Sequence, residues 1–334
     1  MVRASRADGG DELVRAPAPG QVPATIHHAA VYGSGDELLA AAVPFIRGGI
    51  AAGEPVLAVT TPVNLELLTS AIGGDTTQLD QAETAVFGPR PPQRVAAFEK
   101  YARRRGNGRR IRILDEPSWT GRTAVEISDW QRMEAGLNLL LEGTGIWMIC
   151  AYDTRQLPEP VIDSARRTHP ALVAGTTTRQ SPSYDDPANY AFSQDAPLPP
   201  PPGSAPLLPA TLRLADIRRF AATQAAATHL DPGLASLMTV AVYETAAYLK
   251  KATGSPVTTR IWQQAGVIFC DLYAHGRAAP GPFDGFQMPD LSQRRPDDGL
   301  WYARQLTTRL DLRAITDGIQ ARLEMPRMSP VETA

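Results

Sequence analysis

The chain has 334 residues, of which 43% are hydrophobic and 20% charged, and this is enough for two domains with apolar cores. Its formal net charge of −2 excludes the strong basic field that favours binding to nucleic acid. No apolar run approaches the ~20 residues of a membrane-spanning helix, and residues 1–24 lack the apolar core of a secretory signal. We therefore expect a cytoplasmic protein that binds neither membranes nor nucleic acid directly.

Short apolar runs and helical patterns alternate through residues 25–192, after a polar segment at 1–24 that we expect to be disordered. Such alternation implies crossover connections, and therefore a mostly parallel sheet with helices on both faces. The sequence thus predicts an α/β domain. Its expected strands are 26–32, 55–60, 110–115 and 145–152, and its expected helices are 36–52, 62–72, 92–105, 125–141 and 160–168.

Proline-rich residues 193–209 mark the boundary to a second domain, because proline at this density forbids a helix and favours an extended, semi-rigid spacer. Residues 210–326 then show another order, with helices before strands, which predicts an α+β sandwich followed by a tail at 327–334. The expected elements are helices 214–228, 232–253 and 300–308, strands 258–264 and 267–273, and a hairpin turning at 316–318.

Cysteine and histidine residues raise the question of a metal or haem site. Cys150 and Cys270 each lie in an apolar, strand-like run, which indicates reduced, buried thiols rather than a disulfide. His27, His28 and His169 join Cys150 in the first domain, but no ligand spacing such as C-x₂-C or H-x₃-H is present. We therefore expect structural histidines and no metal.

The first domain carries a series of motifs between residues 27 and 170. It opens with HHAAVY, continues with VPFIRGGIAAGEPVL, and later shows DEPSW, QRME, CAYD and RTHP. In this order the motifs resemble the MEDS sensory domain, named from methanogen and methylotroph regulators. The resemblance implies a RecA-like fold without a phosphate loop. The turn at 32–36 agrees, since it has two glycines but no Lys-[Ser/Thr] pair to hold phosphates.

Parallel sheets bind ligands at the carboxyl ends of their strands, where a few polar groups and aromatic walls form a small-molecule pocket. For Trp119, packing in the core remains an alternative to lining the pocket. The residues expected at this edge, and hence the sensory-pocket candidates, are His28, Tyr32, Glu116, Trp119, Tyr152 and Asp153.

The second domain contains the helical run AVYETAAYLKKA, a strand GVIFCDLY followed by AHG at 274–276, and then DDGLW. This order resembles the GHKL ATPase superfamily with its Bergerat-type sandwich, and within it the anti-sigma-factor serine kinases of bacteria. The resemblance makes Glu244 the acidic residue of the first motif, which would act as the base of an active kinase. Tyr243 and Tyr248 stand where the family has two amides, the second of which holds Mg²⁺.

The other two motifs of that family also lack polar groups here. Ala274 stands where an aspartate would bind adenine, although Gly276 keeps the glycine, and Asp297 replaces one of two phosphate-loop glycines while Gly299 remains. Removing one polar interaction from a closed site costs about 1–3 kcal/mol, so micromolar ATP binding is expected to be out of reach. From the residues alone, Glu244 could equally be a solvated helix residue, with both tyrosines filling the core.

These features predict a signalling regulator of the anti-sigma-factor type, which senses a small effector or partner and acts through protein binding by a pseudokinase domain. Its expected partner is a sigma factor or an anti-sigma antagonist. We expect no cofactor, with ATP and Mg²⁺ required only if the variant site is competent. The alternative is an active serine/threonine kinase that uses Glu244, and a third interpretation is a scaffold for oligomerisation, such as a homodimer.

Overall fold

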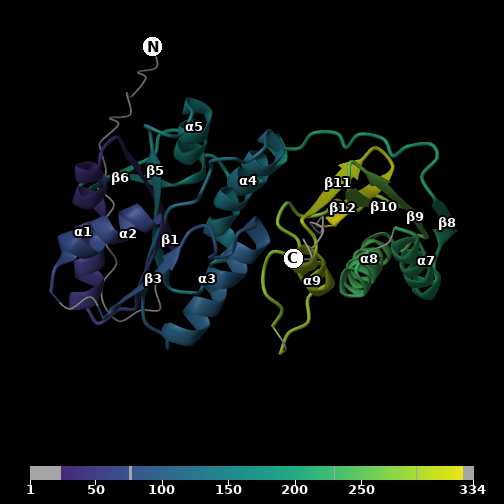
Figure 1. The fold of residues 1–334 in the computed structure, drawn as a ribbon, viewed down its shortest axis with the longest axis horizontal. Helices are drawn as coiled ribbons and strands as arrows, with labels where there is room; N and C mark the ends of the chain where they lie inside the picture. Colours follow the sequence, from purple (N-terminus) through teal and green to yellow (C-terminus); the bar gives the residue numbers. More distant parts are fainter. Residues whose placement is uncertain (1–23, 75–76, 229, 291, 326–334) are drawn as a thin grey trace, which may run out of the picture. The chain divides into compact units, whose positions relative to one another are not determined.

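The computed structural model describes residues 24–74, 77–228, 230–290 and 292–325. The segment 1–24 that was expected to be disordered, apart from its last residue, and the expected tail at 327–334 lie outside the described residues. The chain divides into two compact units, with Ala191 the last residue of the first and Phe192 the first of the second (Figure 1). The two units are described separately.

The first unit is built on a seven-stranded sheet with the order β3-β2-β4-β5-β1-β6-β7. All neighbouring strands run parallel except β7, which is antiparallel to β6. This confirms the predicted α/β domain with a mostly parallel sheet. The strands are β1 (Ile26–Tyr32), β2 (Val56–Thr60), β3 (Leu79–Glu83), β4 (Ile111–Asp115), β5 (Ile146–Asp153), β6 (Ala171–Ala174) and β7 (Thr177–Gln180).

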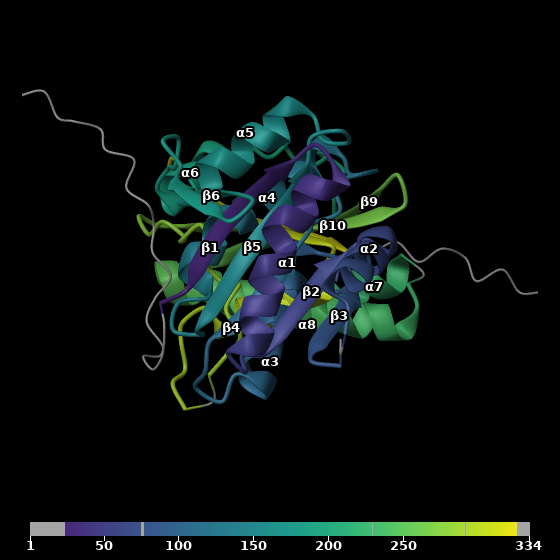
Figure 2. The same cartoon turned by 90° about the vertical axis from the view of Figure 1, so that its left-hand side faces the viewer.

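Helices cover both faces of this sheet, as crossover connections require. The helices α1 (Gly35–Ala51) and α2 (Pro62–Ile72) lie on one face, onto which Figure 2 looks. The opposite face is covered by α3 (Pro91–Arg105), α4 (Ala124–Leu140) and α5 (Glu159–Thr168) (Figure 1). The sequence did not predict β3, β6, β7 or the short helix α6 (Pro187–Ser193), because these elements are brief, and β3 and β7 are also largely polar.

Gly88 allows the loop after β3 to lie against the first turn of α3. Its φ is +61°, and a Cβ at this position would lie 2.5 Å from the Arg94 Cα. The close approach lets the fully buried Arg94 donate to Asp115 Oδ1 at 3.1 Å and to the Thr84 carbonyl at 2.9 Å. These bonds attach α3 to the carboxyl ends of β3 and β4.

We predict that Gly88→Ala destabilises the protein by about 1–3 kcal/mol more than Gly121→Ala, because only the first adds a backbone clash to the cost of a positive φ. Gly121 is a matched control, with φ +78° and no described atom within 4 Å of its added Cβ. Urea unfolding followed by far-UV circular dichroism measures the destabilisation of each variant. Equal destabilisation would contradict the prediction.

The second unit is built on a five-stranded antiparallel sheet with the order β11-β12-β10-β9-β8. Three helices lie on one face of it: α7 (Leu214–Ala227), α8 (Pro232–Thr253) and α9 (Asp298–Leu306) (Figure 1). This is an α+β arrangement, while the likeness to the GHKL fold stays a prediction. The strands are β8 (Leu207–Thr211), β9 (Val257–Gln264), β10 (Val267–His275), β11 (Arg309–Ile315) and β12 (Gly318–Met325).

The proline-rich segment is bound to this sheet and is not a free spacer. Arg322 donates to the Pro199 carbonyl at 2.7 Å, and Arg313 forms an ion pair of 3.1 Å with Asp195. The end of the expected linker, at 207–209, belongs to β8. Its prolines forbid a helix as predicted, but the arginines supply partners for its carbonyl groups, so residues 195–211 are structurally part of the second unit.

We predict that Arg322→Met destabilises the second unit by about 3–5 kcal/mol, because it leaves the buried Asp271 carboxylate without its cation. Arg219→Met removes the exposed ion pair with Asp216 and should cost less than about 1 kcal/mol. Hydrogen exchange of the β10 and β12 amides, followed by mass spectrometry, measures the destabilisation of each variant. Unchanged protection in Arg322→Met would contradict the prediction.

Candidate functional site

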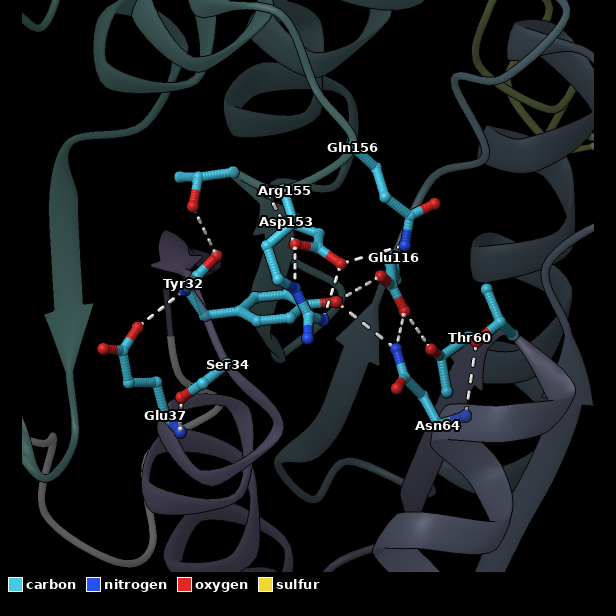
Figure 3. Close-up of polar contacts among 12 residues, drawn as sticks. Tyr32, Ser34, Glu37, Thr60, Asn64, Glu116, Asp153, Arg155 and Gln156 are labelled. Atoms are coloured by element: carbon cyan, nitrogen blue, oxygen red, sulfur yellow. Dashed lines mark hydrogen bonds and ion pairs between the residues drawn. The ribbon is translucent and has the colours of Figure 1, made fainter.

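Four strands of the first unit end in polar or aromatic residues at one edge of the sheet. Tyr32, Thr60 and Asp153 are the last residues of β1, β2 and β5, and Glu116 directly follows β4. Because the strands run parallel, their carboxyl ends meet at this edge, where α/β sheets bind ligands. Figure 3 shows that the side chains point toward one another.

Glu116 is the centre of this edge and is nearly buried. Its carboxylate accepts hydrogen bonds from the Tyr32 hydroxyl at 2.6 Å, from Asn64 Nδ2 at 2.8 Å and from the Thr60 hydroxyl (Figure 3). Burial, and then the neighbouring Glu116 carboxylate, raise the pKa of Tyr32 above its usual range, so the phenol remains a donor at neutral pH. The polar groups around Glu116 are therefore hydrogen-bonded to one another.

In the turn after β1, backbone amides donate hydrogen bonds to nearby side chains. Gly33 N donates to Glu37 Oε2 at 2.6 Å, and Glu37 N donates to Ser34 Oγ at 3.2 Å. In a phosphate loop these amides would face the ligand. Here a carboxylate of α1 occupies the anion position, which argues against phosphate binding at this turn.

Asp153 belongs to the same edge but has different partners. It is buried and accepts hydrogen bonds from Arg155 Nε at 2.8 Å and Gln156 Nε2 at 2.9 Å. Hydrogen bonds from Arg155 lower the pKa of Asp153, and the Arg155 guanidinium lies 5.7 Å from the centre of the Tyr32 ring. These contacts cover the end of β5 with the side chains of the following turn.

A pocket of about 490 Å³ lies between the sheet and α1, away from that edge. We call it the α1-face pocket. His28 points into it, and burial lowers the pKa of this histidine to about 4, so the imidazole is neutral at pH 7. Phe45 and Trp147 form an edge-to-face pair in its wall, with Arg112 stacked 4.6 Å from the Trp147 ring. Its lining residues are Ile26, His28, Ala41, Pro44, Phe45, Arg112, Trp147, Ile149, Val173, Gly175, Thr176, Thr177 and Thr178.

The six sensory-pocket candidates are divided among three places and do not line one cavity. His28 lies in the α1-face pocket, whereas Tyr32, Glu116 and Asp153 close the carboxyl edge. Trp119 and Tyr152 are buried on the opposite face, with ring centres 6.2 Å apart.

Sequence reasoning missed most of the α1-face pocket. Phe45 and Trp147 resemble core residues in the sequence, and nothing in it pairs them with the β6–β7 turn at 175–178. The only available signal was the alternation of His28 with apolar residues along β1.

Four of the residues predicted for a nucleotide site in the second unit lie together. Tyr248 is buried and donates to Asp284 Oδ2 at 2.5 Å, and Asp297 Oδ2 accepts from Gly285 N at 2.9 Å. Gly299 lies so close to the Glu244 carboxylate that an added Cβ would collide with it. Burial raises the pKa values of both Glu244 and Tyr248.

The other three predicted residues lie elsewhere in the second unit. Ala274 is fully buried near the end of β10, between Val257 and Ile319 of the neighbouring strands. Gly276 packs against Thr253 at the end of α8. Tyr243 lines a separate pocket of about 460 Å³ between α7 and α8, to which Glu244 also contributes.

The tertiary structure gathers three residues that the sequence marked as structural. His27, Cys150 and His169 converge with Glu134 of α4, and all four are buried. Burial lowers the pKa of His27 to about 3 and lowers that of His169. His28 is not part of this cluster, because successive residues of a strand point to opposite faces.

Comparison with known families supports the nature of the first unit. The family model described as the methanogen/methylotroph, DcmR sensory domain (MEDS) matches residues 26–170. That range runs from the start of β1 to the end of the loop after α5. The prediction of a MEDS domain is therefore confirmed for this part of the chain. No curated protein matches the chain.

The second unit has no such support, and its likeness to GHKL ATPases stays a prediction. None of the helices within the described residues has the length and apolar composition needed to cross a bilayer.

We predict that Tyr32→Phe costs about 1–3 kcal/mol of stability, because it removes a donor from the buried Glu116 carboxylate. Tyr184→Phe, at a side chain that is 38% exposed, should change stability by less than about 0.5 kcal/mol. Thermal unfolding of the two variants beside the native protein tests this. Similar midpoints for Tyr32→Phe and Tyr184→Phe would show that the network contributes little.

Proposed function

We propose that this protein is a cytoplasmic signalling regulator whose first unit binds a small effector in the α1-face pocket. The observation that carries the proposal is the MEDS match over residues 26–170 together with a pocket lined mostly by that region and completed by β6 and the turn after it. A cavity of about 490 Å³ suits a small molecule. The closed network around Glu116 makes the carboxyl edge a weaker candidate for the effector site.

The lining of the pocket suggests the chemistry of the effector. Phe45, Trp147 and Ile149 offer an apolar wall, and neutral His28 offers one hydrogen-bonding group. The Arg112 side chain already donates to Glu54 and to the Phe45 carbonyl, so it is poorly placed to balance an anionic ligand. These properties favour a small, mostly apolar molecule with one polar group.

The second unit, in this proposal, acts by binding a partner protein of the sigma-factor or anti-sigma-antagonist type. Tyr248 is engaged by Asp284, and Gly299 contacts Glu244, so two of the positions needed for metal and phosphate are filled by the protein itself. Effector binding would then shift the population of partner-binding states without catalysis.

We predict that Mg-ATP produces no binding heat when it is titrated calorimetrically into the full chain. The triple variant Tyr248→Asn, Ala274→Asp, Asp297→Gly restores the polar groups of the family motifs and is titrated alongside. Heat from neither protein, or from the variant alone, supports a pseudokinase. Micromolar binding by the native chain would instead favour the alternative, a serine/threonine kinase with Glu244 as its base.

We predict that a thermal-shift screen of small apolar molecules with one polar group yields a ligand whose affinity falls at least about 10-fold in Thr177→Trp, because the indole obstructs the pocket rim. Thr120→Trp is the matched control, since Thr120 is exposed and does not line the pocket. A ligand that binds Thr177→Trp as well as the native protein would place the effector elsewhere.

A further inference from the structure

Four side chains from four different elements bring their metal-binding atoms to one point inside the first unit. They are His27 of β1, Glu134 of α4, Cys150 of β5 and His169, which directly follows α5. One ligand atom from each residue lies within 4.8 Å of all the others, and all four residues are buried. We call this group the H2CE cluster.

The separations within the H2CE cluster suit a tetrahedral ion. His27 Nε2 lies 3.2 Å from Cys150 Sγ and 3.5 Å from Glu134 Oε2, and His169 Nε2 lies 3.5 Å from the same oxygen. A tetrahedron with metal–ligand bonds of about 2.0–2.3 Å has edges of about 3.3–3.8 Å. These three separations are close to this range, and the other separations are at most 4.8 Å, so binding an ion at the centre requires the ligand atoms to move together by about 1 Å or less.

His169 is oriented as a metal ligand would be. Its Nδ1 lies 2.8 Å from the Ala165 carbonyl, which can only accept a hydrogen bond, so Nδ1 carries the proton. The Nε2 lone pair is then directed toward Glu134 and the rest of the cluster. Metal-binding histidines typically donate their second N–H to a carbonyl or carboxylate in this way, which fixes the ring and its tautomer.

Glu134 is the least satisfied member of the cluster. Its side chain is 1% exposed, and neither oxygen accepts a hydrogen bond of normal geometry from another described residue. The nearby arginine, Arg94, is already paired with Asp115 at 3.1 Å. The ionised form of this carboxyl group is unfavourable beside two neutral imidazoles and a thiol, because none of them balances its charge. A divalent cation would convert all four groups into ligands.

We propose that the H2CE cluster binds one divalent transition-metal ion, with zinc as the best match. Two imidazole nitrogens, a thiolate and a carboxylate are a ligand set for Zn²⁺ rather than for Mg²⁺ or Ca²⁺, which prefer oxygen ligands. Because the protein supplies all four ligands, the site is closed and serves structure rather than hydrolysis. The ion would join β1 and β5 to α4 and to the end of α5.

The test measures metal binding by the full chain. Protein stripped with a chelator is titrated with Zn²⁺ against a competing chelator, and separately with Co²⁺ as a spectroscopic probe. Cys150→Ser and His169→Gln each remove a ligand, whereas Cys270→Ser removes the other buried thiol and is the matched control.

We expect one equivalent of Zn²⁺ per chain, a higher unfolding temperature with zinc, and a thiolate-to-cobalt charge-transfer band in the native protein and in Cys270→Ser. Loss of that band in Cys150→Ser, and zinc binding weakened at least about 10–100-fold in His169→Gln, would support the site. Stripped native protein that binds neither ion, or a cobalt spectrum without thiolate character, would overturn the proposal even if the variants fail to fold.

Discussion

The parallel pairing of β1 with β5 is the constraint on which the first unit depends. The pairing runs along all of β1, from Ile26 opposite Trp147 to Tyr32 opposite Asp153. It directs His28 and Tyr32 to the α1 face and His27 to the face covered by α4. A slip of one residue would exchange these faces, so the α1-face pocket, the Glu116 network and the H2CE cluster would be lost together. An ion bound through His27 and an effector bound beside His28 would therefore act on neighbouring residues of one strand.

The second unit depends on a different feature, which is a layer of buried ion pairs on one face of its sheet. Within the described residues, the helices of this unit lie on one face of its antiparallel sheet. The other face carries a buried series of opposite charges that includes Asp271, Arg322, Asp311 and Arg313. The proline-rich segment supplies carbonyl acceptors to the same arginines. The proline-rich segment, which resembles an independent linker in the sequence, therefore packs on this charged face of the sheet. Its carbonyl groups accept hydrogen bonds from Arg313 and Arg322.

Much of the secondary structure followed from local patterns, and the exceptions have a common cause. The apolar run at Ile26–Tyr32 and the Thr61-capped helix from Pro62 to Ile72 have the bounds that their sequences predict. The strand Thr177–Gln180 was missed because it is short and all four of its residues are polar, so no apolar pattern marks it, although it pairs with β6 at the edge of the sheet. Leu207–Thr211 was missed because Pro206 precedes this strand and Pro209 lies within it, and proline is unusual in strands. The strand is stabilised by its pairing with β9, which the local sequence does not reveal.

The sequence by itself determined the alternation of strands and helices in the first unit and the lack of a Lys-[Ser/Thr] pair after the first strand, since each depends on residues close together in the chain. Only the tertiary structure decided which polar residues share a site. It assigned Tyr32 to a closed network, His28 to a pocket and His27 to a cluster with Glu134, although the three lie within six residues on one strand. The physical reason is that strand order and side-chain alternation, which select the neighbours of each residue, are set by packing across the whole sheet.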